Sequence, residues 1–308
     1  MKSQTHNATG TQGSNTASSR GLNSPVLNYI SALSVALLVF LVSCAPARRA
    51  TVVDQDSSAG HETLNAAVWM QLSAEYAGSA LQAYRVATMQ LGEALKDTSW
   101  SALPGQHGAG SFQSAVILDV DETVLDNSPF QARLVRANQT FARDAWNEWV
   151  REERALPIPG ALDFVRSASD AGVRVFYVTN RSSDLEEATR NNLIAYGFPV
   201  AGDVDVVLTR GELAAWTGDK SSRRDFVAKD HRILLLVGDD LNDFVVADGV
   251  SSEGRSALVD QNAAYWGSRW IVLPNPVYGS WERTVNQEGA ARSRSEQIRA
   301  KSEALRTQ

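Results

Sequence analysis

From His61 to about Lys96, apolar residues recur every three or four positions, which predicts one long helix with a single buried face. We expect this helix to be broken near Gly78. Downstream, short β-branched runs alternate with segments of helical length. The predicted strands are residues 115–119, 173–179, 204–208 and 233–238, with weaker ones at 257–259 and 271–273, and the predicted helices are residues 160–171, 184–196 and 211–229. This alternation predicts an α/β fold with a mostly parallel sheet covered by helices on both faces.

The N-terminal segment has a different pattern. Its first 25 residues are polar, and an apolar run from Val26 to Val42 then ends at Cys44, the only cysteine. The run has the length of a signal-peptide apolar region, and LVSC resembles a bacterial lipobox. We therefore expect residues 1–43 to be a signal peptide with a long polar leader, Cys44 to carry lipid, and residues 44–60 to be a tether. The expected location is the bacterial cell envelope, at the outer membrane. The alternative to a lipoprotein is a protein that keeps the apolar run as a signal anchor.

Composition narrows the function classes. A chain of 308 residues that is 44% hydrophobic can bury a large core. Acidic residues outnumber basic ones by 35 to 29, which argues against a partner that is a nucleic acid polymer. A single cysteine, expected to carry lipid, leaves no disulfide and no cysteine nucleophile for the folded domain.

Carboxylates gather where two predicted strands end. Asp119 and Asp121 follow one strand, and Asp239 and Asp243 follow another. In parallel sheets the carboxyl ends of neighbouring strands meet at one edge, where ligands bind. So much buried like charge requires a counter-ion, and oxygen ligands without histidine or cysteine favour Mg²⁺ over Zn²⁺.

Residues that suit a phosphoryl group follow the same pattern. Thr179, Asn180 and Arg181 end the strand VRVFYVT, and Lys220 opens a predicted helix. A hydroxyl, backbone N–H groups and an ammonium group can together hold phosphoryl oxygens. These residues predict a site for a small phosphate.

The motifs DVDETVLDNSPF, VFYVTNR, GDKS, VGDDLNDF, DQN and LPNPVYGSWE, in this order, resemble those of the haloacid dehalogenase (HAD) superfamily. More narrowly they resemble class C acid phosphatases, bacterial lipoproteins also described as 5′-nucleotidases. The resemblance covers about residues 64–281. It implies a HAD-like Rossmannoid domain over residues 61–285, with a small helical cap built from residues 61–100 and 129–157. Residues 286–308 remain as a polar tail.

The resemblance also implies roles for these residues in a Mg²⁺-dependent phosphatase. Asp119 is the expected nucleophile, which forms an aspartyl-phosphate, and Asp121 the expected acid and base. The expected metal ligands are the Asp119 and Asp239 carboxylates and the Asp121 backbone carbonyl. Thr179 and Lys220 are expected to bind the phosphate oxygens. Asp243 is expected to order Lys220, and Asn180 and Arg181 are expected to lie behind the phosphate-binding residues. An acidic pH optimum is expected.

The substrate is the least constrained feature. The resemblance matches Trp146 and Tyr278 to two rings that stack on a nucleobase, which predicts nucleoside 5′-monophosphates as substrates and possible homodimer formation. At helical spacing, Trp146 and Trp149 could instead form one apolar helix face. The alternative functions are a phosphatase for sugar phosphates or other small phosphates, and a surface lipoprotein that captures nucleotide or haem.

The remaining polar residues are expected to be structural. Asp126 and Asn127 either close the turn after the first acidic loop or take part in function, and Glu122 is expected to face solvent or to lie behind the site. Asp240 is expected to point away from the metal. Other residues in this group are Arg223 and Arg224, expected on a solvated helix face, and His61, His107 and His231, whose spacing does not suggest a metal site.

Overall fold

The computed structural model describes residues 61–200, 202–286 and 293–307. Its strands are β1 (Gln113–Leu118), β2 (Leu125–Asp126), β3 (Leu156–Pro157), β4 (Arg174–Ser182), β5 (Val207–Arg210), β6 (His231–Gly238) and β7 (Trp270–Val272). Its α-helices are α1 (Leu64–Leu72), α2 (Ala74–Lys96), α3 (Ser128–Ala137), α4 (Arg143–Arg151), α5 (Ala161–Asp170), α6 (Glu186–Ala195), α7 (Ser221–Ala228), α8 (Ser252–Gln261), α9 (Ser280–Asn286) and α10 (Arg294–Ala304). Short 3₁₀ turns are η1 (Ala109–Ser111), η2 (Ser183–Leu185) and η3 (Leu241–Asp243).

Five parallel strands form the central sheet in the order β5-β4-β1-β6-β7. Strand β1 pairs with β4 and β6 on its two sides, so the residues after β1 lie between the ends of both neighbours. Every residue of β6 is buried, as expected for a strand covered on both faces. The predicted α/β fold with a parallel sheet is therefore confirmed.

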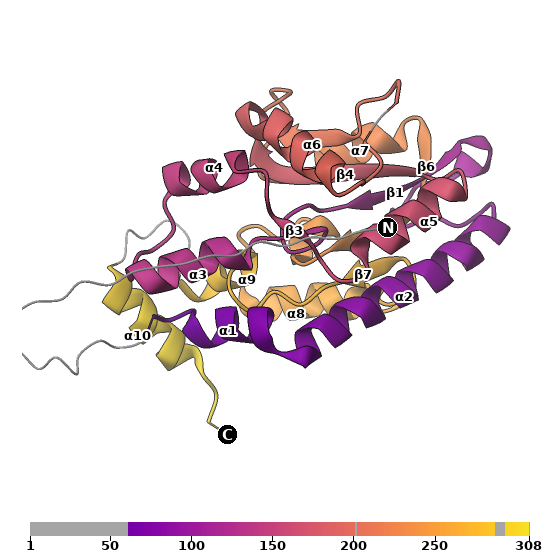
Figure 1. Cartoon of the computed structure of the whole chain (residues 1–308). Coiled ribbons are helices and arrows are strands. Elements are labelled where there is room, and N and C mark those ends of the chain that lie inside the picture. Colours follow the sequence, from indigo (N-terminus) through magenta and orange to yellow (C-terminus); the bar gives the residue numbers. More distant parts are fainter. Residues whose placement is uncertain (1–60, 201, 287–292, 308) are drawn as a thin grey trace, which may run out of the picture. The chain divides into compact units, whose positions relative to one another are not determined.

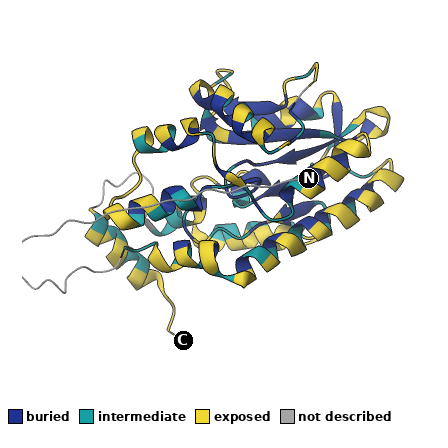
Figure 2. Ribbon diagram, viewed as in Figure 1, coloured by how far each residue is buried: buried dark blue, intermediate teal, exposed yellow. Residues whose placement is uncertain are grey.

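Helices cover this sheet on its two sides (Figure 1). Helices α2 and α5 lie against each other, with α2 packed on β6 and β7 and α5 on β4. Helix α7 packs on β6 from the opposite side. Dark blue residues in Figure 2 mark the buried sheet and the inner faces of these helices, whereas their outer faces are exposed.

The segment between β1 and α5 forms a small insertion. It contains α3 and α4, and its ends are joined by the two-stranded antiparallel ribbon of β2 and β3. Helix α1 packs against α3. The insertion and α1 thus lie together, while α2 belongs to the helical layer of the sheet.

Three local predictions were wrong. Gly78 lies inside α2, and the helix breaks instead at Ser73, whose Oγ accepts a hydrogen bond from the N–H of Tyr76 and begins a new helix. Residues 257–259 lie in α8, because a short apolar run fits a helix as well as a strand. Only Ser221–Ala228 of the predicted 211–229 helix is α-helical.

Helix α10 lies in the predicted polar tail and joins the two ends of the described chain. Arg294 on α10 donates to Glu62 just before α1, at 2.7 Å from Nε, and to the Asn138 side chain at 2.6 Å. Lys301 pairs with Glu282 of α9 at 2.5 Å. We call the Arg294–Glu62 pair the terminal clasp.

Cys44 and the predicted signal peptide and tether lie outside the described residues, so the lipid anchor and outer-membrane location remain predictions. Among residues 61–200, 202–286 and 293–307, no helix is long and apolar enough to cross a membrane.

A tyrosine pair tests how α2 supports the loop after β1. The buried Tyr84 hydroxyl on α2 donates to the Thr123 carbonyl oxygen at 2.6 Å. Tyr84→Phe should lower the free energy of unfolding by about 1–2 kcal/mol, because a buried acceptor loses its donor. Chemical denaturation measures the change.

Tyr177→Phe is the matched control. Its hydroxyl is also buried but has no hydrogen-bond partner within the described part of the chain. Its removal should leave stability unchanged or raise it. Equal destabilisation by both substitutions would contradict the role given to the Tyr84 bond.

Candidate active site

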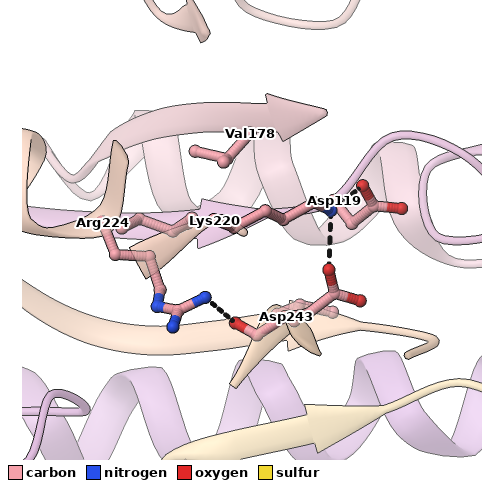
Figure 3. Close-up of a pocket in the computed structure, with 7 residues that line it drawn as sticks. Asp119, Val178, Lys220, Arg224 and Asp243 are labelled. Carbon is pink, nitrogen blue, oxygen red and sulfur yellow. Dashed lines mark hydrogen bonds and ion pairs between the residues drawn. The ribbon is translucent and has the colours of Figure 1, made fainter. Parts of the chain in front are cut away.

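Asp119, Lys220 and Asp243 form the centre of the site (Figure 3). Asp119 directly follows β1, and its backbone N–H donates to Val237 of β6 at 2.9 Å. The Lys220 ammonium, at the start of α7, donates to Asp119 Oδ1 and, at 2.6 Å, to Asp243 Oδ1. All three side chains are buried. The structure thus brings together one predicted nucleophile and one predicted phosphate ligand.

Asp239 lies beside this group at the end of β6. Its Oδ1 is 3.3 Å from the Thr123 hydroxyl, and its Oδ2 accepts from the Asn275 amide at 2.8 Å. The same Thr123 hydroxyl lies 3.5 Å from Asp119 Oδ2. Thr123 therefore bridges the two carboxylates, a role that the Asp-x-Asp-x-Thr spacing could have indicated. Asn275 lies in the quoted motif LPNPVYGSWE but was not predicted as a site residue.

The pKa values reflect this crowding. Burial, opposed by Lys220 and reinforced by Asp243 and Asp121, raises the pKa of Asp119 to about 7. Burial and the charge of Asp119 raise the pKa of Asp239 well above its usual range. For Lys220 the two aspartates outweigh burial and raise its pKa, so it stays charged. Without a further cation, this crowding therefore favours the protonated form of Asp239.

A divalent cation fits this environment. One carboxylate oxygen each from Asp119, Asp239 and Asp243 lies within 4.8 Å of the others. Within residues 61–200, 202–286 and 293–307, Asp239 has no ion-pair partner, so its charge is left for a metal to balance. Oxygen-only ligands suit a hard cation such as Mg²⁺.

Asp243 is already engaged by protein groups. Its Oδ1 accepts from Lys220, and its Oδ2 accepts from the backbone N–H of Asp240 at 2.9 Å. These bonds agree with the expectation that Asp243 orders Lys220. The Asp121 backbone carbonyl as a metal ligand remains a prediction.

Asp121 lies on the other side of Asp119 in a hydrogen-bonded group. Its Oδ1 accepts from Arg181 Nε at 3.0 Å and from Arg181 Nη2 at 2.8 Å. The Thr179 hydroxyl lies 3.5 Å from Asp121 Oδ2 and accepts from the backbone N–H of Arg181. Three predicted site residues are therefore in contact.

Two predictions about nearby polar residues were wrong. Arg223 and Arg224 are buried rather than on a solvated face. Arg223 donates to the Thr179 carbonyl oxygen and to the Asn180 side chain, and Arg224 donates to the Asn242 carbonyl oxygen at 2.9 Å. They hold the segments that carry Thr179 and Asp243. The Asn180 amide donates to the Gly218 carbonyl oxygen at 2.9 Å, and its oxygen accepts from Arg223; its place behind the phosphate ligands remains a prediction.

The two predicted stacking residues lie near different parts of the site, Trp146 near Arg181 and the Tyr278 backbone near Asn275. The half-buried Trp146 ring of α4 lies 5.7 Å from the Arg181 guanidinium carbon. Tyr278 follows β7, and its backbone N–H donates to Asn275, the residue that holds Asp239. Trp149 is buried and donates to the Asn127 side chain at 2.8 Å.

Other acidic residues support the loop. Glu122 is buried and accepts from the Asn127 backbone N–H at 2.9 Å, so it does not face solvent, and burial raises its pKa well above the usual range. Asp126 accepts from the Ser128 N–H, as expected for a turn residue. Asp240 accepts from the Ser280 N–H and hydroxyl and points away from the metal group, as predicted. His231 is a buried residue packed on Phe176.

Residues 31–281 match the family described as HAD superfamily, subfamily IIIB (acid phosphatase). The chain belongs to this family. Its fold is similar to the class C acid phosphatase from Bacillus anthracis, with a TM-score of 0.72 and 30% sequence identity over 81% of this chain and 98% of that one. A structure described as that enzyme with tungstate bound gives a TM-score of 0.71 at 29% identity, with the same coverage.

Among curated relatives, acid phosphatase 1 of Solanum lycopersicum is 28% identical over 166 residues, which is 53% of this chain and 57% of the tomato protein. The chain spans a little over half the length of the first curated relatives it matches. The family and its fold are established on these grounds.

The raised carboxyl pKa values predict a pH dependence of stability. Between about pH 4 and 7 the unfolded chain has released protons that Asp119 and Asp239 still hold when folded, so stability falls as pH rises. Asp239→Asn removes one of these two titrating carboxyl groups. Without metal, the variant should therefore gain melting temperature over the wild type as pH rises from 4 to 7, by about 2–4 °C per kcal/mol.

With saturating Mg²⁺ the wild type should instead have the higher melting temperature, because the ion stabilises only the protein that keeps both carboxylates. Comparing the two proteins at each pH cancels the opposing contribution of His231, whose pKa burial lowers. Parallel melting curves of wild type and variant, with and without Mg²⁺, would contradict the assignment.

Proposed function

We propose that this protein is a Mg²⁺-dependent acid phosphatase that hydrolyses phosphomonoesters through an aspartyl-phosphate. The observation that carries the proposal is Asp119, held at the end of β1 by Lys220 and placed two residues before Asp121. One carboxylate is positioned to attack phosphorus and a second to transfer a proton. Subfamily membership supports this reaction class.

In the first step an Asp119 carboxylate oxygen attacks phosphorus. A bond from Asp119 to phosphorus forms while the bond from phosphorus to the ester oxygen breaks, and Asp121 gives its proton to the departing oxygen. The product alcohol leaves. Lys220, with its ammonium on Asp119, stabilises negative charge on the phosphoryl oxygens as it is redistributed.

In the second step water attacks the phosphorus of aspartyl-phosphate. Asp121, now ionised, takes a proton from that water, and the bond to Asp119 breaks to release phosphate. Both carboxylates return to their starting states, so the cycle balances with water as the only co-reactant.

Asp119 and Asp239 would hold the metal ion, with Asp243 fixing Lys220 next to it. A bound Mg²⁺ supplies charge that neutralises phosphoryl oxygens and lets two carboxylates stay ionised side by side.

The proposed substrates are nucleoside 5′-monophosphates, as in class C enzymes also described as 5′-nucleotidases. Trp146 lies beside Arg181, and Tyr278 is bonded through its backbone N–H to Asn275, the residue that contacts Asp239. We propose that a base attached to a bound phosphate stacks on these two half-buried residues. A class C structure similar to this one holds tungstate, a tetrahedral oxyanion, and this supports a phosphate-binding site here.

Turnover tests the reaction. Purified residues 45–308 with Mg²⁺ should release phosphate from AMP and p-nitrophenyl phosphate at acidic pH, and Asp119→Asn should lower kcat by about 10³-fold or more, since the nucleophile is lost. EDTA should abolish release. A folded, metal-bound wild type that releases no phosphate from either compound would overturn the proposal and leave ligand capture as the function to test.

Ring removal tests the substrate. Stacking on a base contributes about 1–3 kcal/mol, so Trp146→Ala and Tyr278→Ala should each raise KM for AMP by about 5-fold or more. Ribose 5-phosphate carries the same sugar phosphate without a base and serves as control, since its KM should not change. Equal changes in KM for both compounds would favour a sugar-phosphate substrate.

A further inference from the structure

Asp121 is held through one of its two oxygens. Oδ1 accepts three donors, namely Arg181 Nε, Arg181 Nη2 and the Asn127 amide at 2.9 Å. Among the described residues, the only side-chain hydrogen-bond donor to Oδ2 is the Thr179 hydroxyl, at 3.5 Å, a distance too long for a strong bond. The Asp121 side chain retains 18% exposure, whereas Arg181 retains 1%. Oδ1 thus accepts three hydrogen bonds, whereas Oδ2 accepts no strong hydrogen bond from a side chain of the described residues.

The donors are themselves fixed by a second set of bonds. Arg181 Nη1 donates to the Thr189 hydroxyl at 3.2 Å. Asn127 Oδ1 accepts from the indole N–H of Trp149 at 2.8 Å, and this sets which way the amide faces. A flipped amide would turn its oxygen toward the Asp121 and Glu122 carboxylates and its NH₂ group toward the indole N–H.

We propose that Arg181 and Asn127, locked by Trp149 and Thr189, are positioning residues that fix Asp121 with Oδ2 aimed at the leaving-group oxygen. This inference rests on the proposed phosphatase function. Three donors on Oδ1 leave no room for a proton there, so the transferable proton is carried on Oδ2. In the first step that proton moves from Oδ2 to the ester oxygen as its bond to phosphorus breaks, and in the second step Oδ2 receives a proton from water.

Two substrates with different leaving groups can show how well the enzyme protonates the departing oxygen. p-Nitrophenolate departs readily without a proton, whereas phenolate needs one, and the two aryl phosphates have similar shapes. The ratio of kcat/KM for p-nitrophenyl phosphate to that for phenyl phosphate therefore rises when the acid is lost or misplaced. Because kcat/KM covers only steps up to ester cleavage, hydrolysis of aspartyl-phosphate does not affect it.

The experiment measures this ratio with saturating Mg²⁺ for the wild type, Asp121→Asn, Arg181→Lys and Trp149→Phe. Lysine keeps the charge of Arg181 but cannot make its forked contact, and phenylalanine keeps an aromatic ring but lacks the indole N–H. We expect Asp121→Asn to raise the ratio most, and each positioning variant to raise it by about 10-fold. Thr189→Val, which removes the Arg181 partner at constant shape, replaces any variant that does not fold.

Trp270→Phe is the matched control. Trp270 is buried on β7, and its indole N–H donates to the Ala102 carbonyl oxygen at 2.8 Å, far along the sheet order from β4. Its ratio should equal that of the wild type. Unchanged ratios in the folded positioning variants, despite a rise in Asp121→Asn, would overturn the inference. A wild type inactive on both esters would instead overturn the proposed function.

Discussion

Buried negative charge at the ends of β1 and β6 constrains everything around it. Parallel pairing of these strands brings the buried Asp119 and the half-buried Asp239 together, in a setting where the carboxylates lose much of their water. One lysine is shared between Asp119 and Asp243, and it leaves Asp239 without a cation in the described part of the chain. The protein thereby keeps a deficit of positive charge that a bound metal cation can make up.

Buried arginines hold the surrounding segments in place. Arg223 reaches the backbone at Thr179, Arg224 reaches the η3 backbone, and Arg181 holds Asp121. A guanidinium presents several donors in a fixed plane, so one side chain can fix two segments at once. Arg223 and Arg224 lie on α7, just after Lys220. This short helix and its N-cap therefore provide both the cation that pairs with Asp119 and the support of the loops around it.

The fold could be predicted because its signal is local. Apolar strands alternate with helices, and the carboxylates follow β1 and β6 directly, so sequence order alone placed Asp119 and Asp239 at one sheet edge. Burial of Arg223 depends on bonding partners that lie 43 and 44 residues away in the sequence. Burial of Glu122 accompanies a left-handed backbone at that residue. Neither feature can be predicted from the spacing of residue types. The strand predicted at 257–259 was wrong because a run of three apolar residues is too short to show whether its periodicity is that of a strand or of a helix.

The terminal clasp has a consequence for how the chain could be rearranged. Arg294 and Glu62 are far apart in sequence but in direct contact, so both ends of the described fold meet at α1 and α10. A chain in which the ends of the described fold are joined there by a short linker, and which is reopened at a distant surface turn, would keep the order of strands around the site. Circular permutation is thus open to this architecture, and the new chain ends could be placed at a distant surface turn without changing the loops that follow β1 and β6.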